Sequence, residues 1–470
     1  MKHLITILVF AVIFSTSVFS QSIDIVKAEI AANTKLNSAG TEGKYNIRNH
    51  ILYLDAKGSG LFFLFSLEPK GYIIIPGKME LPPVLAYSFT DDPDPEGRFV
   101  SLVQADLTFR VKNQTLDVIE RNRMAWNNIP EHLSKAPLFQ QWPEPGTTTS
   151  EGWVETNWTQ SSPYNQLCPM DLVTGSRSIA GCPAVAMAQI VNFHRTLNGV
   201  HFSDNDDYHH NYAGRNYMID DDYITVDFPS FPMLNYYLDT LQTNYDSGTP
   251  LDNRDKAALT FACGVAARQV YTSSASGTFG VDQALDAYLK FNFEEVELLE
   301  EDDTNLYSRM AQNIKDTLPV HLAVVDSAWS MGHNVVVDGY NTDEYFHLNF
   351  GWGGSSNGWY LLPEEFPYGL TVVEGVIVDI IPDHPTGIAE KDNQPALFYP
   401  NPARDIVYFS ANKSGFTKAE IYSPDGRLCR TINLEQTGMS LDISDFPEGI
   451  YFIRMHAGNN ETSGKLLIHR

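Results

Sequence analysis

Two proline-marked breaks divide this chain of 470 residues and limit what it can fold into. The first contains Pro137, Pro143 and Pro145, and the second runs from Pro382 to Pro395. Proline removes a backbone donor and restricts the residue before it, so neither stretch continues a helix or a central strand. The chain is longer than the roughly 100–200 residues of one domain. We therefore expect three packed parts, with an exposed, easily cut linker at the first break.

Residues 1–20 have the pattern of a secretory signal. Lys2 precedes an apolar run from Leu4 to Phe14, and small residues follow as far as Ser20. We expect this segment to be removed on export. The apolar run is shorter than the roughly 20 residues that cross a bilayer, and no other stretch is long and apolar enough. We therefore predict a secreted or cell-surface protein without a transmembrane span.

Residues 21–140 predict a small α+β unit. A short helix near residues 22–36 is followed by apolar segments separated by turn-forming residues, and a periodic stretch from Leu102 to Trp126 indicates a further helix. The apolar segments, which we expect to be strands, are His50–Leu54, Leu61–Phe65, Tyr72–Ile75 and Val84–Phe89.

The two parts that follow differ from each other in pattern. Residues 145–385 mix helical and strand-like patterns, and we expect helices near Pro183–His194, Lys256–Tyr271 and Val281–Phe291. In residues 396–470, strand-like runs alternate with turns such as Ser-Pro-Asp-Gly and Pro-Glu-Gly, which predicts a small all-β sandwich. The expected fold class is α+β, with an all-β module at the end.

Charge and cysteine content narrow the possible functions. The formal net charge of -26 would repel a phosphate backbone, so we do not expect nucleic acid as a partner. The 4 cysteines are too few for a disulfide framework and lack zinc spacing, so we expect a working thiol, no metal and no cofactor. Aspartates at 204–207 and 220–222 leave a calcium site as an alternative, although they lack the spacing of a calcium loop and a solvated loop explains them better.

The strongest candidate for a reactive thiol is Cys182, in the segment Gly181-Cys182-Pro183. Apolar residues follow at helical spacing, and Pro183 fits only the first turn of that helix, so Cys182 stands at the helix entrance. The free amides and the positive end of the helix dipole favour the thiolate over the thiol. A buried structural cysteine is the alternative, and we assign that role to Cys263; the role of Cys168 stays open.

A predicted β-hairpin supplies a base for that thiol. Two β-rich runs flank a short turn, and if the turn centres on Asn341, His333 lies directly across from Asn349 with both side chains on one face. An amide oxygen that accepts a hydrogen bond from the imidazole fixes its tautomer, which completes an arrangement of nucleophile, base and orienter. Trp352 follows in a glycine-rich turn, where it would shield the imidazole from water.

Two other histidines are rivals for the role of base. His194 lies on the helix of Cys182 itself, about three turns along it, and His347 has no amide opposite it. Apart from the hairpin geometry, His333 would be read as a surface strand residue. The hairpin is therefore what selects His333.

These motifs resemble the streptopain family of papain-like bacterial cysteine proteases. The resemblance rests on matching order and separation of a glycine-cysteine pair before a helix with Ala188-Gln189-Ile190, then Gly332-His333, then Asn349-Phe350-Gly351-Trp352-Gly353-Gly354. Two positions depart from the family pattern. Phe350 stands where tryptophan is frequent, and Met331 stands where a second glycine often precedes the histidine. Neither departure removes a reacting atom, although either could reshape the substrate cleft.

The resemblance implies roles for further segments. The segment from Trp158 to Asn165 is similar to the family segment whose glutamine donates to the oxyanion, so Gln160 inherits that role; a loop cap is the alternative. The loop at residues 273–280 is similar to a glycine-rich family loop, as a wall of the cleft or simply a mobile loop. Residues 21–140 resemble the family's inhibitory prodomain, so the chain's own prodomain is expected to inhibit it.

The resemblance also implies a destination and an activity. Residues 396–470 resemble the C-terminal sorting domain of type IX secretion, with an ordinary surface-binding β-sandwich as the alternative. Residues 145–385 are then a papain-like domain of a secreted cysteine endopeptidase, synthesised as a zymogen, that cleaves protein or peptide substrates with the thiolate of Cys182 and with His333 as general base and acid. Its expected partner is the type IX secretion machinery. The alternative function is a catalytically inactive, surface-binding protein on a protease scaffold.

Overall fold

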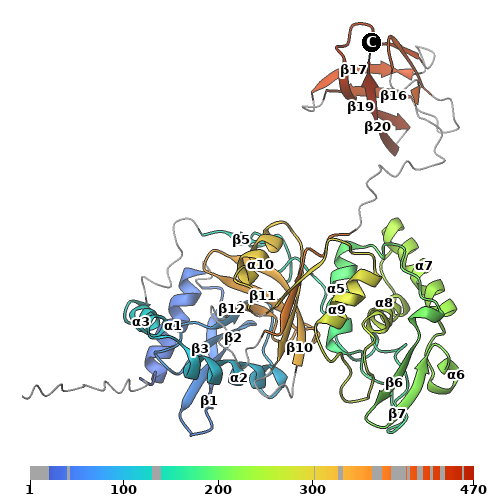
Figure 1. The fold of residues 1–470 in the computed structure, drawn as a ribbon. Coiled ribbons are helices and arrows are strands. Elements are labelled where there is room, and N and C mark those ends of the chain that lie inside the picture. The colour runs from blue at the N-terminus through green and yellow to red at the C-terminus, as the bar shows by residue number, and fades with distance from the viewer. Residues whose placement is uncertain are drawn as a thin grey trace, which may run out of the picture. The chain divides into compact units, whose positions relative to one another are not determined.

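The computed structural model divides the chain into two compact units, Met1–Asp383 and His384–Arg470 (Figure 1). It describes residues 21–39, 43–129, 139–300, 302–325, 332–362, 373–382, 398–399, 403–409, 417–423, 427–434, 440–457 and 460–469. The expected signal at residues 1–20, Pro137 and most of the second proline-marked break lie outside the described residues.

An 11-stranded sheet runs through the first unit in the order β1-β2-β3-β4-β12-β11-β10-β9-β13-β8, and β5 pairs with β10 off this path. The strands are β1 (Asn46–Leu54), β2 (Gly60–Glu68), β3 (Tyr72–Pro76), β4 (Ala86–Ser88), β5 (Gln141–Trp142), β8 (Glu297–Glu300), β9 (Val320–Val325), β10 (Gly332–Asn341), β11 (Tyr345–Asn349), β12 (Gly358–Leu361) and β13 (Gly375–Val378). Strands β1 to β4 confirm the strands expected in residues 21–140. They continue the sheet of the later strands, because Tyr87 in β4 pairs with Trp359 in β12.

Helices flank this sheet and form most of the rest of the first unit (Figure 1). In residues 21–140 they are α1 (Ile25–Ser38), α2 (Arg98–Asn113) and α3 (Leu116–Asn127). Later in the chain they are α5 (Cys182–His194), the 3-10 helix η1 (Asp204–Asp206), α6 (Tyr223–Val226), α7 (Phe231–Ser247), α8 (Asn253–Ala266), α9 (Asp282–Lys290) and α10 (Leu306–Lys315). A hairpin of β6 (Tyr208–Tyr212) and β7 (Arg215–Ile219) accompanies them.

The prediction of one helix from Leu102 to Trp126 is wrong, because the structure has two helices there. The helix breaks at Gln114, whose ψ of 145° is extended, and α3 then starts afresh. Thr115 caps it by accepting a hydrogen bond from the amide of Val118. The apolar period continues across this break, so periodicity alone did not reveal it.

Helix α5 packs between strand β10 of the sheet and helix α8. Its residues from Pro183 to Val191 are all buried, as expected of a helix that is apolar on every side. One core joins Met187 and Ile190 of α5 to Leu234 and Phe261 of the surrounding helices. Each such side chain stabilises the fold by about 1.5–3 kcal/mol. The start of α5 is therefore held in a fixed position beside the sheet.

The second unit is built from strands, as predicted for the tail. Its two sheets have the orders β14-β15-β18 and β17-β16-β19-β20. The strands are β14 (Phe398–Tyr399), β15 (Ile406–Phe409), β16 (Lys418–Tyr422), β17 (Leu428–Asn433), β18 (Ser440–Asp442), β19 (Gly449–Ala457) and β20 (Asn460–Ile468). Val407, Ile421, Ile453 and Leu466 share its core. Within the described parts of both units, none of the helices has the length and apolar character needed to cross a membrane.

Candidate active site

Cys182 is the first residue of α5, as the position of Pro183 predicts. Gly181 precedes it with φ of 85° and ψ of 140°, and as a glycine it has no side chain to cap this end of the helix. The amides of the first turn and the positive end of the helix dipole are therefore directed at the Cys182 region. The thiol is partly exposed. An anionic sulfur is favoured at such a position.

Only glycine fits at residue 181. A Cβ atom there would lie 2.7 Å from Oε1 of Gln269 and 3.1 Å from the carbonyl oxygen of Ser276. Gln269 is fixed because its Nε2 donates to the carbonyl oxygen of Ala180 at 2.7 Å. Ser276 belongs to the loop at residues 273–280, so this loop packs directly against the start of α5, where the wall of a cleft would lie.

The carboxylate of Asp171 fixes the same loop. Nε and Nη2 of Arg215 donate to it at 2.8 and 2.7 Å, and the amide and hydroxyl of Ser273 each donate to it at 2.8 Å. The hydrogen bonds from Arg215 hold the pKa of Asp171 far below its usual range, although burial opposes them. Sequence reasoning missed this buried ion pair, because nothing in either segment points to the other.

The hairpin of β10 and β11 has a different register from the one predicted. Asn349 pairs with Val336 and not with His333. The side chain of Asn341 accepts two backbone hydrogen bonds within the turn, which centres on Asp343. The prediction that His333 lies across from Asn349 is therefore wrong, since a turn placed later in the chain moves every cross-strand pair.

The imidazole of His333 is held by the segment after the hairpin. Its Nε2 lies 2.8 Å from the carbonyl oxygen of Phe350. A carbonyl oxygen only accepts, so Nε2 carries a proton, and in the neutral ring Nδ1 is the basic nitrogen. The indole of Trp352 stacks on the ring, with centroids 4.6 Å apart and an angle of 29° between the planes. Trp352 therefore covers His333, of which 4% is exposed.

Asn349 connects β11 to α5. Its Nδ2 donates to the carbonyl oxygen of Thr156 at 2.8 Å, and its Oδ1 accepts from the amide of Gly351 at 3.1 Å and from Nε2 of Gln189 at 3.4 Å. Gln189, on α5, is fully buried and also accepts from the amide of Trp158 at 3.2 Å. Among the described residues, Asn349 thus anchors the turn that contains Phe350, whose carbonyl oxygen contacts the imidazole.

Gln160 lies beside the start of α5. Its carbonyl oxygen accepts from the amide of Ala180 at 2.8 Å, and the carbonyl oxygen of Trp158 accepts from the amide of Gly353 at 3.0 Å. Gln160 is 8% exposed. These backbone bonds bring the segment of Gln160, the entrance of α5 and the glycine-rich turn to one place.

Asn334 is a site residue that the sequence reasoning missed. Its Nδ2 lies 3.9 Å from Sγ of Cys182. This contact places the strand that carries His333 against the entrance of α5. The only signal in the sequence was an amide side chain directly after the candidate base.

The remaining cysteines have other surroundings. Burial raises the pKa of the Cys168 thiol to about 12 and that of Cys263 well above its usual value. Both are fully buried, so both stay protonated and unreactive at neutral pH. These surroundings are those of core residues, and Cys168 is part of the hydrophobic core. Cys429 is exposed in the second unit.

His347, one of the rival bases, belongs to a separate buried group. Its Nδ1 lies 2.6 Å from Oδ1 of Asp338, and both side chains are fully buried. Burial alone would lower the pKa of His347, but the charge and hydrogen bond of Asp338, with Glu151 and Asp91 nearby, outweigh burial and raise it. Burial also raises the pKa of Asp91 and of Glu151. We call these four residues the junction cluster, because Asp91 lies in residues 21–140 and the others lie beyond.

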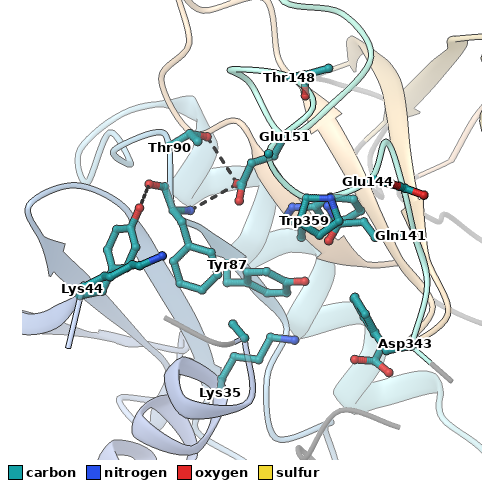
Figure 2. A pocket seen from close by; sticks show the side chains of 16 residues that line it. Lys35, Lys44, Tyr87, Thr90, Gln141, Glu144, Thr148, Glu151, Asp343 and Trp359 are labelled. Atoms are coloured by element: carbon teal, nitrogen blue, oxygen red, sulfur yellow. Dashed lines mark hydrogen bonds between the residues drawn. The ribbon is translucent and has the colours of Figure 1, made fainter. Parts of the chain in front are cut away.

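A pocket of about 470 Å³ lies near the junction cluster (Figure 2). Figure 2 shows the carboxylate of Glu151, which accepts a hydrogen bond from the hydroxyl of Thr90, and Lys35 on the opposite side, where Nζ lies 4.0 Å from the ring centre of Tyr87. The described residues that line this pocket include none of the predicted site residues. The pocket is thus distinct from the place where Cys182 meets Asn334.

Three of the aspartates considered for calcium have partners within the protein. Asp206 pairs with Lys290 at 2.7 Å, and Asp220 and Asp222 each accept a backbone hydrogen bond. In the part of the chain that the structure describes, no group of three or more histidine, cysteine or acidic residues is placed to hold a metal ion.

Two family descriptions match this chain. Residues 158–360 match the Peptidase C10 family, and residues 397–469 match the secretion system C-terminal sorting domain. The first match contains Gln160, Cys182, His333, Asn349 and Trp352. The second covers the described strands of the second unit and indicates export by type IX secretion, to the outside of the cell or its surface.

Similar proteins include two curated relatives and one solved structure. The thiol protease/hemagglutinin PrtT of Porphyromonas gingivalis is 25% identical over 331 residues, which is 67% of this chain and 35% of that protein, so the chain spans about a third of its length. Streptopain of Streptococcus pyogenes is 23% identical over 362 residues, covering 71% of this chain and 81% of streptopain. The structure of a prointerpain A fragment from Prevotella intermedia is 18% identical, with a TM-score of 0.48, and covers 72% of this chain and 100% of the fragment.

Proposed function

We propose that this chain, whose residues 158–360 match the peptidase C10 family, is a secreted cysteine endopeptidase made as an inactive precursor. One observation carries the proposal. Cys182 begins a buried helix against the strand of His333, and the carbonyl of Phe350 accepts from Nε2 of His333 at 2.8 Å. That bond leaves Nδ1 of the neutral ring as the base that a thiol nucleophile needs.

In the first half of the reaction, Nδ1 of His333 takes the proton of the Cys182 thiol, and Sγ attacks the carbonyl carbon of a peptide bond. The tetrahedral intermediate collapses to a thioester as the imidazolium returns the proton to the leaving amine. Water then attacks the thioester with His333 again as base, and the acid product leaves with the thiol restored. Trp352, stacked on the imidazole, keeps bulk water away from it.

The negative oxygen of each intermediate needs hydrogen-bond donors. The backbone amide of Cys182 and the side-chain amide of Gln160 are the two groups that we assign to it. A donor of this kind typically lowers the barrier by about 3 kcal/mol. The bond from Ala180 to the carbonyl of Gln160 supports the assignment, because it ties the backbone of Gln160 to the residues directly before Cys182.

The contacts of residues 21–140 support latency. Phe99 of α2 packs edge-on against Phe350, with ring centroids 5.7 Å apart and 79° between the planes. The carbonyl oxygen of Asp92 also accepts from the amide of Ser356 at 2.9 Å, in the loop that follows Trp352. This segment thus touches the loop that positions His333. We propose that it acts as an intramolecular inhibitor by fixing that loop in a resting arrangement.

The activating cut lies in the linker before β5. Trp142 of β5 pairs with Tyr340 of β10, so β5 is part of the sheet that carries His333 and stays with it. Removal of residues 21–140 would also free the edge of β12, which pairs with β4 in the full chain. Protein or peptide substrates are then expected to enter beside Cys182.

Casein hydrolysis by the purified full chain and by its Cys182→Ala variant tests the function. We expect the variant to lose activity by about 10³-fold or more, because the nucleophile is gone. It should also remain uncleaved in its own linker, as N-terminal sequencing and intact mass would show, with its circular dichroism unchanged. Cys429→Ala is the matched control and should keep full activity. Normal casein hydrolysis by Cys182→Ala would exclude the proposal.

A further inference from the structure

A series of hydrogen-bonded, buried polar side chains ends at Sγ of Cys182, and the inference drawn from this series rests on the proposed function. The hydroxyl of Tyr288 lies 3.2 Å from Nδ1 of His321, and Nε2 of His321 lies 2.7 Å from Oδ1 of Asn334. Nδ2 of Asn334 lies 3.9 Å from the sulfur. The series of side chains thus runs from α9 through β9 and β10 to the entrance of α5.

The charge state of His321 determines which atoms of this series carry the protons. Tyr288 and His321 are fully buried. Burial lowers the pKa of His321 to about 4, and the hydrogen bond of Asn334 only partly offsets this. The ring is therefore neutral at neutral pH and carries one proton. Two proton arrangements are then consistent with the distances.

In the first arrangement Tyr288 donates to Nδ1 of His321, Nε2 donates to Oδ1 of Asn334, and the amide directs an N–H at the sulfur. In the second, every bond is reversed and an amide oxygen faces the sulfur. The second arrangement leaves the buried Tyr288 hydroxyl without an acceptor among the described residues, because His321 is its one hydrogen-bond partner there. The first arrangement gives the Tyr288 hydroxyl, both ring nitrogens of His321 and the amide oxygen of Asn334 a partner.

We propose that Asn334 is a residue of the catalytic site that stabilises the thiolate of Cys182, and that His321 and Tyr288 are positioning residues that hold its amide with the N–H toward the sulfur. A hydrogen bond to the charged form favours that form, and bonds to an ionised acceptor are stronger than neutral ones. The contact is 3.9 Å long here, and we expect it to shorten once the sulfur is charged, because catalytic hydrogen bonds tighten in the working state.

This role differs from that of His333. The imidazole takes the proton from the thiol, whereas Asn334 does not titrate and acts only on the thiolate that remains. Among the described residues, the titratable groups that this proposal places next to the sulfur are His333 on β10 and, through Asn334, His321 on β9 and Tyr288 on α9. Removal of Asn334 should raise the pH at which the thiolate forms and leave the reactivity of the thiolate itself largely unchanged.

The test is the pH dependence of alkylation of Cys182 by iodoacetamide, followed by intact mass on the full chain. Cys429→Ser is the background, since that thiol is exposed. For Asn334→Ala we expect alkylation about tenfold slower near about pH 6 and less than about twofold slower near about pH 9. Asn334→Asp should slow the acid-side reaction further, because a carboxylate repels the thiolate.

Tyr288→Phe tests the end of the side-chain series that lies furthest from Cys182, and it removes a single oxygen atom. It should slow acid-side alkylation about threefold, with no change at high pH. Tyr245→Phe is the matched control, because that buried hydroxyl donates to Asn192 at 3.1 Å and is not part of the series; it should leave the profile unchanged.

Equal slowing at all pH values, or profiles of the Asn334 and Tyr288 variants that coincide with the parent, would overturn the inference. If Asn334→Ala fails to fold, the Tyr288→Phe profile decides alone. The proposed function fails separately, when Cys182→Ala still hydrolyses casein, so the two failures are distinguishable.

Discussion

The carbonyl oxygen of Phe350 lies 2.8 Å from Nε2 of His333. A backbone atom therefore occupies the place that the sequence assigned to the side chain of Asn349. The backbone acceptor has a consequence for mutagenesis, because no substitution at Asn349 removes the atom that sets the tautomer of the ring. Asn349 instead fixes the backbone around Phe350: its side chain accepts a hydrogen bond from the amide of Gly351 and donates one to the carbonyl oxygen of Thr156.

Asn349→Ala should therefore act mainly on stability. The variant loses a buried hydrogen bond to Thr156 and leaves Gln189 without one of its partners, which costs about 1–3 kcal/mol. We expect a lower free energy of unfolding in urea and a peptidase pH profile of unchanged shape. A shifted pH profile at unchanged stability would mean that the amide contacts the imidazole directly.

Gly181→Ala should damage both the fold and the site. The new Cβ would meet Gln269 and Ser276, and the backbone keeps a φ of 85° that suits only glycine. Gly146→Ala is a matched control, since Gly146 also has a φ of 85° but a Cβ atom added there would have no neighbour within 4 Å. The control measures backbone strain of about 1 kcal/mol. We expect Gly181→Ala to cost about 2 kcal/mol more, by urea unfolding, and to abolish casein hydrolysis; equal costs for the two variants would contradict the steric account.

Asp171→Asn should destabilise the loop at residues 273–280. It leaves the buried guanidinium of Arg215 without its charged partner, which costs about 3–5 kcal/mol. Because the folded state lowers the pKa of Asp171, the wild-type advantage is present above the ordinary aspartate pKa and is lost as the pH falls. The control is Asp227→Asn, which breaks the exposed pair with Arg177 and should cost less than about 1 kcal/mol. A difference between Asp171→Asn and the parent that grows toward acid pH would contradict the sign.

The junction cluster should make the joined chain more stable toward acid pH. The folded state raises the pKa of Glu151, Asp91 and His347. Their contribution is fully present below their ordinary pKa values and is lost as the pH rises through the raised ones. Glu151→Gln, made in the Cys182→Ala chain to prevent self-cleavage, should raise the thermal midpoint near about pH 7 and leave it unchanged near about pH 3. A lower midpoint for Glu151→Gln at neutral pH would show that the carboxylate charge is needed there.

The sequence was sufficient for the local parts of the site. Pro183 placed Cys182 at the entrance of a helix, because a proline without an amide hydrogen tolerates only the first turn. The register of the β10 and β11 hairpin was not predictable, since it depends on the turn that Asn341 closes with its side chain and on a bulge between Val337 and Gly339. Because the turn centres on Asp343 and not on Asn341, His333 and Asn349 do not pair.

Contacts across long sequence distances were also beyond reach. The hydrogen-bonded side chains from Tyr288 to Cys182 join two helices and two strands, and Asp171 pairs with Arg215 of β7, 44 residues further along the sequence. Buried polar groups must find partners, but the sequence does not say which partners the fold brings near. The resemblance to a family supplied the order of the reacting residues, and only the fold showed that a backbone carbonyl orients the base.

The central claim is that Cys182 is the nucleophile, and covalent labelling during turnover tests it most directly. The matured enzyme would be titrated with an irreversible peptidyl electrophile while casein hydrolysis is followed, and the labelled residue located by peptide mass spectrometry. We predict that activity falls in proportion to label, reaching zero at about one equivalent, all on Cys182. Full activity in protein labelled at Cys182, or loss of activity with the label on Cys429, would contradict the account.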